Sequence, residues 1–171
     1  MAPRINVFLS ALLALSLNSN ANGVETGHPA PNCRLTAIDG AQRFDLQQYR
    51  GKVVYVDFWA SWCPPCAESF PFMNQLHHEL ADRGLHIVAI NLDESPGEAK
   101  DFLAKHPPHF AVVVDAEGNC PQAFGVKAMP SSYLVDRQGA IRYVHLGFRP
   151  GEANELRARV EQLLAERPAG Q

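Results

Sequence analysis

The chain has 171 residues, of which 46% are hydrophobic, and its formal net charge is -3 at pH 7. This length suits one domain with a core of its own rather than two domains. The hydrophobic content excludes an intrinsically disordered chain and a multi-span membrane protein, and the negative charge excludes the basic surface that binds nucleic acid.

Residues 1–21 have the parts of a secretory signal peptide. Arg4 gives a positive start, residues 7–17 (VFLSALLALSL) are apolar apart from serines, and residues 19–21 (SNA) supply a small-residue cleavage site. A helix that spans a bilayer needs about 20 apolar residues, so this run is too short for one. We expect export to the periplasm with cleavage after Ala21, and an uncleaved membrane anchor is the alternative.

Residues 22–32 are polar and rich in Gly and Pro, which is typical of a leader that precedes a domain. Residues 33–46 contain Asp39-Gly40 between two short alternating runs, a pattern that predicts a β-hairpin. Residues 52–60 form a nearly continuous apolar, β-branched and aromatic run. This run predicts a strand that is buried on both faces, in the centre of a sheet and with parallel neighbours.

The remainder of the chain alternates between helical and strand patterns. Apolar residues at helical spacing, followed by Gly84, predict a helix over residues 64–83 that is kinked at Pro71. Further helices are predicted for residues 96–106, 119–124 and 152–166, and strands for residues 85–92, 110–115, 131–136 and 141–145. The domain, residues 33–171, is therefore predicted to be an α/β sandwich with a mixed central sheet.

The segment Cys63-Pro64-Pro65-Cys66 lies where the central strand ends and a helix begins, which is a redox arrangement. A helix N-terminus has unsatisfied N–H groups and the positive end of the helix dipole, so it favours the thiolate form of Cys63. Cys66 is close enough in sequence to close a disulfide ring. We expect Cys63 to be the exposed attacking sulfur and Cys66 the shielded resolving sulfur.

The two prolines limit this stabilisation of the thiolate. Pro64 and Pro65 suit the first helical positions, but neither has an N–H group to donate to the Cys63 sulfur. The Cys66 N–H and the helix dipole must then supply most of it. A mildly stabilised thiolate favours a reductant or isomerase over an oxidase.

A metal site is the main alternative for these cysteines. A structural zinc site needs two further ligands, but Cys33 and Cys120 are single and distant and no two histidines have H-x-x-x-H spacing, so we expect neither metal nor cofactor. Soft thiolates also suit Cu(I), so a non-enzymatic copper-delivery module using Cys63 and Cys66 stays open, although no Met-rich or His-rich segment lies beside them. Purely structural cysteines are a third possibility.

Several motifs carry a resemblance to a known family. The run VDFWASWCPPC, followed by Pro71, resembles the thioredoxin superfamily. WASWCPPC, the export signal and residues 30–36 (APNCRLT) are similar to the TlpA/ResA/DsbE branch of exported thiol-disulfide oxidoreductases, and residues 125–136 (GVKAMPSSYLVD) to its second signature. The resemblance covers residues 30–165. It implies a thioredoxin-like α/β fold, a mixed central sheet flanked by helices, with an N-terminal β-hairpin extension.

The resemblance also implies roles for individual residues. Asp57 matches a buried acid of the family; burial should raise its pKa, so that it can accept the Cys66 proton. Met129-Pro130 matches a cis peptide bond that exposes backbone for pairing with a substrate strand, and Trp62 matches an aromatic that covers the disulfide. The alternatives are an Asp57 paired with a lysine or with backbone amides, a trans Pro130 and a core Trp62.

The chain departs from the family at a few positions. ResA-type members have a glutamate where this chain has Ser69, and Glu68 is one residue early, which rotates it by about 100° on a helix. We therefore do not transfer the glutamate's role to Glu68. Cys33 replaces an expected aromatic and Cys120 is additional, and the two could form a disulfide or remain buried thiols.

The sequence thus predicts an exported, monomeric disulfide reductase. Its expected partners are a disulfide-bearing protein substrate, with cytochrome c maturation components as one class that the resemblance allows, and a membrane thiol donor that restores the dithiol.

Overall fold

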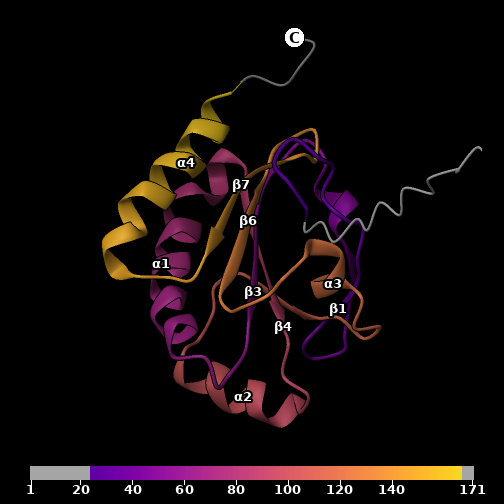
Figure 1. The fold of residues 1–171 in the computed structure, drawn as a ribbon. Coiled ribbons are helices and arrows are strands. Elements are labelled where there is room, and N and C mark those ends of the chain that lie inside the picture. The colour runs from indigo at the N-terminus through magenta and orange to yellow at the C-terminus, as the bar shows by residue number, and fades with distance from the viewer. Residues whose placement is uncertain (1–23, 167–171) are drawn as a thin grey trace, which may run out of the picture.

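A seven-stranded mixed sheet forms the centre of the computed structural model, which describes residues 24–166, and its strand order is β2-β1-β5-β4-β3-β6-β7. Helices α1 and α4 lie side by side on one face of the sheet and α3 lies on the other (Figure 1). The strands are β1 Arg34–Ala37, β2 Arg43–Asp45, β3 Val53–Trp59, β4 Leu85–Asn91, β5 Ala111–Val114, β6 Ser131–Val135 and β7 Ile141–Leu146. The predicted thioredoxin-like fold is confirmed.

The helices begin and end close to their predicted positions. They are α1 Pro64–Leu80, α2 Pro96–Lys105, α3 Cys120–Phe124 and α4 Ala153–Ala165, with short 3-10 turns at Leu46–Tyr49, Ala81–Arg83 and Pro150–Glu152. Pro71 lies inside α1 without ending it. None of the helices between residues 24 and 166 has the length and apolar character that crossing a membrane requires. The predicted signal peptide, residues 1–21, lies outside the described residues.

Strand β3 is the central element, and all of its residues are buried. Val53, Tyr55 and Trp59 face the core under α1 and α4, whereas Val56 and Phe58 face the core on the other side of the sheet. β3 pairs in parallel with β4 but antiparallel with β6. The expectation of parallel neighbours on both sides was therefore wrong for β6, because a continuous apolar run indicates burial on two faces and carries no information on strand direction.

The N-terminal hairpin extends this sheet. β1 pairs antiparallel with β2 and also with β5, so the hairpin lies beside the parallel part of the sheet. Cys33, just before β1, forms a disulfide with Cys120 at the start of α3. The alternative of two buried thiols is therefore wrong, and the bridge joins the hairpin to the segment that leads toward Pro130.

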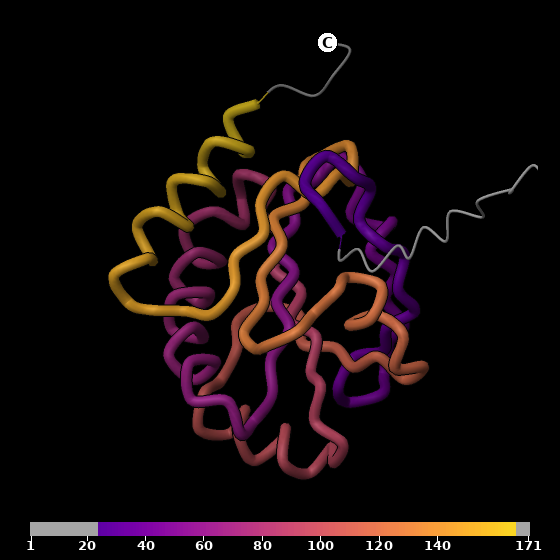
Figure 2. The backbone as a smooth tube through the Cα atoms, viewed as in Figure 1, coloured from indigo at the N-terminus to yellow at the C-terminus, as the bar shows by residue number. Residues whose placement is uncertain are grey.

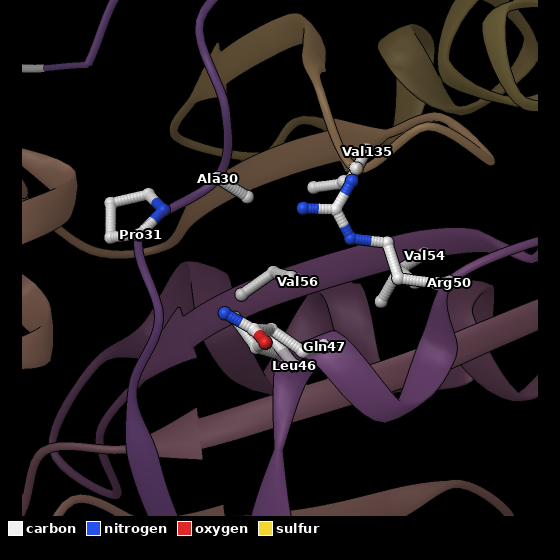
Figure 3. A pocket seen from close by; sticks show the side chains of 9 residues that line it. Ala30, Pro31, Leu46, Gln47, Arg50, Val54, Val56 and Val135 are labelled. Carbon is white, nitrogen blue, oxygen red and sulfur yellow. The ribbon is translucent and has the colours of Figure 1, made fainter.

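The second half of the predicted leader contacts the domain. The N–H groups of Gly27 and Ala30 donate to the carbonyls of Ile141 and Gly139 at 2.7 and 2.9 Å, so this segment and the β6–β7 turn meet at one end of the sheet (Figure 2). Ala30 also lies with Arg50 and Val135 around a small cavity above β3 (Figure 3). This part of the predicted leader is therefore attached to the domain by backbone hydrogen bonds, although its composition is typical of a linker.

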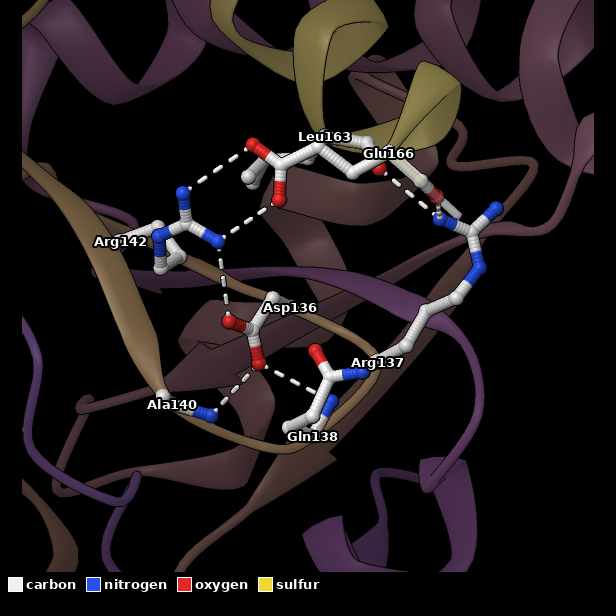
Figure 4. A network of polar contacts seen from close by, with 7 residues as sticks. All are labelled: Asp136, Arg137, Gln138, Ala140, Arg142, Leu163 and Glu166. Carbon is white, nitrogen blue, oxygen red and sulfur yellow. Dashed lines mark hydrogen bonds and ion pairs between the residues drawn. The ribbon is translucent and has the colours of Figure 1, made fainter. Parts of the chain in front are cut away.

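Polar contacts join the β6–β7 turn to the end of α4 (Figure 4). Arg137 donates to the carbonyls of Leu163 and Leu164 at 2.8 and 3.1 Å, where the negative end of the helix dipole favours a cation. Arg142 bridges Asp136 and Glu166 at 3.2 and 2.8 Å. These contacts hold α4 across the sheet face that also carries α1.

Replacing Cys33 and Cys120 together by alanine should lower the free energy of unfolding by about 2–5 kcal/mol, the usual cost of removing a native disulfide. The bridge joins residues separated by 87 positions, so the unfolded chain gains much conformational freedom when it is lost. Guanidinium unfolding of the variant and the parent, both with the Cys63–Cys66 disulfide intact, measures the difference.

The matched control is the Cys63→Ala/Cys66→Ala variant, whose bridge has a sequence separation of 3 and so restrains the unfolded chain much less. A loss in the Cys33→Ala/Cys120→Ala variant no larger than in this control would contradict the expectation.

Candidate active site

The two motif cysteines lie at the junction of β3 and α1. Cys63 is the N-cap residue of α1 and forms a disulfide with Cys66, whose backbone N–H donates to the Cys63 sulfur at 3.3 Å. Pro64 and Pro65 occupy the first helical positions, where they have no N–H to donate. The Cys63 sulfur thus has the backbone donor that the sequence predicts.

The exposure of Cys63 is lower than the sequence predicts. We expect an exposed attacking sulfur, but Cys63 is 4% exposed, against 0% for Cys66. In this disulfide form the Cys63 sulfur is bonded to the sulfur of Cys66, which is fully buried, and it is therefore held at the start of α1. Cys63 nevertheless borders a surface hollow whose lining includes Trp62 and, from α2, Glu98. Cys66 does not line this hollow, so Cys63 is the cysteine of the pair that borders it.

Trp62 lies on the surface beside Cys63. Trp62 is 67% exposed and lines the same hollow as Cys63. The alternative of a core position for Trp62 is therefore wrong. The core tryptophan is Trp59, which is fully buried and packs against Phe70 and Phe102 with ring centroids 5.0 and 4.8 Å away.

The loop before β6 contains a cis peptide bond between Met129 and Pro130. The Pro130 carbonyl accepts a hydrogen bond from the Gly147 N–H at 2.8 Å, and Met129 packs partly buried against the core that holds Cys63 and Cys66. Within residues 24–166 the Met129 backbone has no hydrogen-bond partner. Its N–H and carbonyl are therefore available to another strand.

Asp57 is fully buried in the middle of β3. Its Oδ1 accepts a hydrogen bond from the Ser132 hydroxyl at 2.6 Å, and its Oδ2 has no partner among the described residues. Burial raises the pKa of Asp57 from the ordinary value of 3.8 to about 7, and the Ser132 hydrogen bond offsets this only in part. The alternative of an Asp57 paired with a lysine or with backbone amides is therefore wrong.

The side chain of Asp57 lies on the face of the sheet that carries α1. Alternate residues of a strand point to the same face, and Tyr55 and Trp59 belong to the core that also contains Cys66. Asp57 lies between these two residues on β3, so its carboxyl group points to the Cys66 side of the sheet. The hydroxyl of Tyr55 donates to Ser132 at 2.9 Å, which completes a buried chain of three polar groups.

Sequence reasoning missed two residues that organise the site, Ser132 and Asp93. Both carboxylate oxygens of Asp93 accept from the Ser61 N–H at 3.0 Å, and Oδ1 also accepts from the Ser61 hydroxyl. Asp93 follows β4, which is parallel to β3, so its position next to the end of β3 could have been found from the order of the strands. Ser132 had a weaker signal, its place two residues after Pro130.

The departure from the family at Ser69 is visible in the structure. Ser69 is buried and donates to the Cys66 carbonyl at 2.9 Å, whereas Glu68 is exposed. Glu68 thus does not occupy the position of the family's glutamate. Between residues 24 and 166 there is no group of three or more His, Cys, Asp or Glu side chains placed to hold a metal ion.

Comparison with known proteins agrees with this geometry. The Redoxin family model matches residues 25–163. The thiol-disulfide oxidoreductase ResA of Bacillus cereus is 32% identical over 123 residues, which are 72% of this chain and 70% of that protein. ResA of Geobacillus thermodenitrificans is 31% identical over 150 residues, which are 84% of this chain and 86% of that protein.

A solved structure gives the same result. The crystal structure of a putative thiol:disulfide interchange protein DsbE from Chlorobium tepidum is 42% identical, with a TM-score of 0.79, and the match covers 83% of this chain and 99% of that one. The chain therefore belongs to the redoxin family and is a thiol-disulfide oxidoreductase of the ResA/DsbE type within the thioredoxin superfamily.

Proposed function

We propose that this enzyme is an exported reductant of protein disulfides that works through the Cys63/Cys66 dithiol. The observation that carries the proposal is that, among residues 24–166, one N–H group, that of Cys66, donates to the Cys63 sulfur. Pro64 and Pro65 at the start of α1 supply no further donors. In strong oxidants the dithiol form is stabilised by a stabilised thiolate, so it gives up electrons reluctantly. The Cys63 thiolate has little such stabilisation, so the dithiol form of this enzyme is the better electron donor.

The reaction has two exchange steps. The Cys63 thiolate attacks the substrate disulfide, a Cys63–substrate disulfide forms, and the first substrate thiolate leaves. Cys66 then gives its proton to the Asp57 carboxylate, attacks the Cys63 sulfur and releases the second substrate thiolate. Two electrons pass to the substrate, and the enzyme ends in the Cys63–Cys66 disulfide form seen in the structure.

Substrate binding involves both sides of the sulfurs. Trp62 borders the hollow beside Cys63, and in the proposed reaction it covers the disulfide. On the other side the backbone of Met129, which has no hydrogen-bond partner between residues 24 and 166, pairs with an extended substrate segment as an added strand.

Residues 1–21 support export, since they have the pattern of a cleaved signal peptide, which leaves residues 22–32 as leader and residues 33–171 as the domain in the periplasm. The substrate is a disulfide-bearing protein, with cytochrome c maturation components as a candidate class. A membrane thiol donor returns the enzyme to the dithiol form, and the enzyme acts as a monomer.

A Cys66→Ser variant should hold its substrate as a mixed disulfide on Cys63, because the attacking sulfur is intact and the resolving sulfur is missing. Non-reducing electrophoresis and mass spectrometry of the trapped species identify the substrate. The matched control is Cys63→Ser, which should trap nothing. Equal trapping by both variants would show that Cys63 is not the attacking sulfur.

The reduction potential of the Cys63/Cys66 pair should lie near or below about -200 mV, in the range of reducing members of the superfamily. Equilibration with glutathione or dithiothreitol buffers measures it. A value near about -120 mV, typical of a strong oxidant, would exclude the reductant assignment. Tight one-to-one Cu(I) binding by the reduced protein without disulfide turnover would instead favour the copper-delivery alternative.

Asp57→Asn should slow the release of the second substrate thiol and remove its rise with pH near pH 7, where Asp57 becomes a carboxylate. Rapid-mixing kinetics from about pH 5 to about pH 9 measures the effect, because this range lies on both sides of the Asp57 pKa of about 7. If the two proteins keep the same profile, Asp57 does not accept the Cys66 proton.

The same variant has a stability signature. Folded Asp57 keeps its proton to about pH 7, whereas the unfolded carboxyl loses it near 3.8. Unfolding therefore releases a proton between these values, and the free energy of unfolding of the parent falls as the pH rises through that window. Asp57→Asn should lack this fall and be the more stable protein at pH 8, which denaturant unfolding at two pH values tests.

A further inference from the structure

Three buried polar side chains meet on the face of the sheet that carries α1. Asp57 on β3 and Ser132 on β6 are register partners, and Tyr55 lies two residues before Asp57, so all three side chains point to this face. Asp57, Ser132 and Tyr55 are 0, 3 and 1% exposed. The hydrogen bonds among them therefore form without competition from bulk water.

These hydrogen bonds have one direction when Asp57 is a carboxylate. A carboxylate has no hydrogen, so the Ser132 hydroxyl must donate to Asp57 Oδ1, at 2.6 Å. Ser132 has one hydrogen, so the Tyr55 hydroxyl must donate to Ser132, at 2.9 Å. Burial raises the pKa of Tyr55 above its ordinary value, so Tyr55 keeps the hydrogen that it donates. The chain from Tyr55 through Ser132 thus stabilises the carboxylate form of Asp57.

The two oxygens of the Asp57 carboxyl group have different surroundings. Oδ1 accepts from Ser132, whereas Oδ2 is buried and has no partner among residues 24–166. A short hydrogen bond stabilises negative charge on the oxygen that accepts it, and this makes Oδ1 the weaker base of the two. Oδ2 is therefore the oxygen at which the carboxylate takes up a proton.

Burial and the Ser132 hydrogen bond are the two causes that give Asp57 its pKa of about 7. On its other side, the register partner of Asp57 on β4 is Ala89, which does not titrate. The residues that α2 and α4 contribute to this core are apolar. The other titratable groups toward this face come from α1 and β7, and they are Cys63, Cys66, Tyr143 and His145 with its partner Glu152. The polar contact that acts directly on the Asp57 carboxyl group is thus the one with Ser132.

We propose that Ser132 and Tyr55 are positioning residues that hold Asp57 Oδ1 and thereby direct the proton of Cys66 to Asp57 Oδ2. This inference rests on the proposed function, in which Asp57 accepts that proton, and it names the atom and the residues that prepare it. One S–H bond of Cys66 breaks and one O–H bond forms at Oδ2, while the Ser132 hydrogen bond to Oδ1 stays in place. The Cys66 thiolate then attacks the Cys63 sulfur.

A purely structural role for Ser132 makes a different prediction. Ser132 would then only satisfy the buried hydroxyl of Tyr55, and its loss would change stability without changing the titration of Asp57. The experiments therefore measure the protonation of Asp57 in the folded protein as well as the rate of the reaction.

The first test follows the NMR chemical shift of the Asp57 carboxyl carbon against pH in the disulfide form. Ser132→Ala should raise the pKa of Asp57 by about 1, because the lost hydrogen bond stabilised the charged form. Tyr55→Phe should raise it less, since Ser132 still donates, and Ser132→Thr should keep the parental pKa because the hydroxyl is retained. The matched control is Ser131→Ala, since Ser131 is a buried serine of the same strand that donates to the Ala128 carbonyl instead.

Infrared difference spectra below the pKa of Asp57 show which oxygen carries the proton. With the proton on Oδ2, Oδ1 is the carbonyl oxygen that accepts from Ser132, so the carbonyl band should move to higher frequency in Ser132→Ala. With the proton on Oδ1, the carbonyl oxygen is the unpartnered Oδ2, and a band that stays in place would overturn the assignment. In the Ser132→Ala/Tyr55→Phe variant neither hydroxyl remains, so a new bond from Tyr55 to Asp57 cannot hide the change.

The kinetic test is the pH dependence of the release of the second substrate thiol, the step in which Asp57 takes the Cys66 proton. In Ser132→Ala the midpoint of the rise with pH should move upward together with the pKa of Asp57. Release at pH 7 should then be about fivefold slower than in the parent, whereas release well above the new midpoint should match it. The release of the first thiol, which reports attack by Cys63, should be unchanged.

The outcomes separate this inference from the proposed function. If Ser132→Ala leaves the pKa and the carbonyl band of Asp57 unchanged, the inference is overturned while the proposed function stands. If the pKa rises but the release of the second thiol does not follow it, Asp57 is not the acceptor of the Cys66 proton and its role in the proposed function fails. A lower unfolding midpoint with an unchanged titration of Asp57 would assign Ser132 and Tyr55 to structure alone.

Discussion

The Asp57 carboxyl group is buried in the central strand with one hydrogen bond, from Ser132. Placing an acid there opposes stability because burial penalises the charged form. The neighbouring strands on both sides of β3, and the helices over this face, keep water away and hold the pKa near neutrality. Packing thus gives the site a carboxyl group whose pKa lies near neutral pH, as the role that we propose for Asp57 requires.

The sulfurs depend on the same strand. β3 delivers the chain to the N-cap position at Cys63, and Asp93, after β4, holds Ser61 just before it. The end of β3, the end of β4 and the start of α1 therefore meet at one edge of the sheet. The position of Asp57 relative to Cys63 and Cys66 is therefore fixed, because Asp57 lies within the buried strand β3 and the cysteines follow directly after it.

Local patterns in the sequence were enough for most of the fold and for the residues of the motif. Period and turn residues placed the α-helices found between residues 24 and 166, but not the 3-10 helix Leu46–Tyr49. An acid in an apolar run indicated a perturbed carboxyl group at Asp57. Relations between distant segments could not be obtained in this way. Neither the antiparallel direction of β6 nor the Cys33–Cys120 bridge has a local signature, because both depend on how far-apart segments meet in space.

The same limit applies to side chains that act through contacts. Ser132 reads as an ordinary strand serine until register places it opposite Asp57, and Asp93 reads as a turn residue until β3 and β4 are aligned. Residues 27–31 have the composition of a linker, yet backbone hydrogen bonds attach them to the domain. Local composition does not indicate these contacts, because each of them is made with a segment that is distant in the sequence.

The N-terminal hairpin has a consequence for self-association. An open sheet edge is a template for aggregation, because its unpaired N–H and carbonyl groups can pair with a strand of another chain. The hairpin covers the edge of β5 and leaves β2 outermost. β2 is three residues long and carries Arg43 and Asp45, so it presents a short, charged edge. The hairpin thereby replaces the edge of β5 by a short, charged strand at the side of the sheet opposite β7.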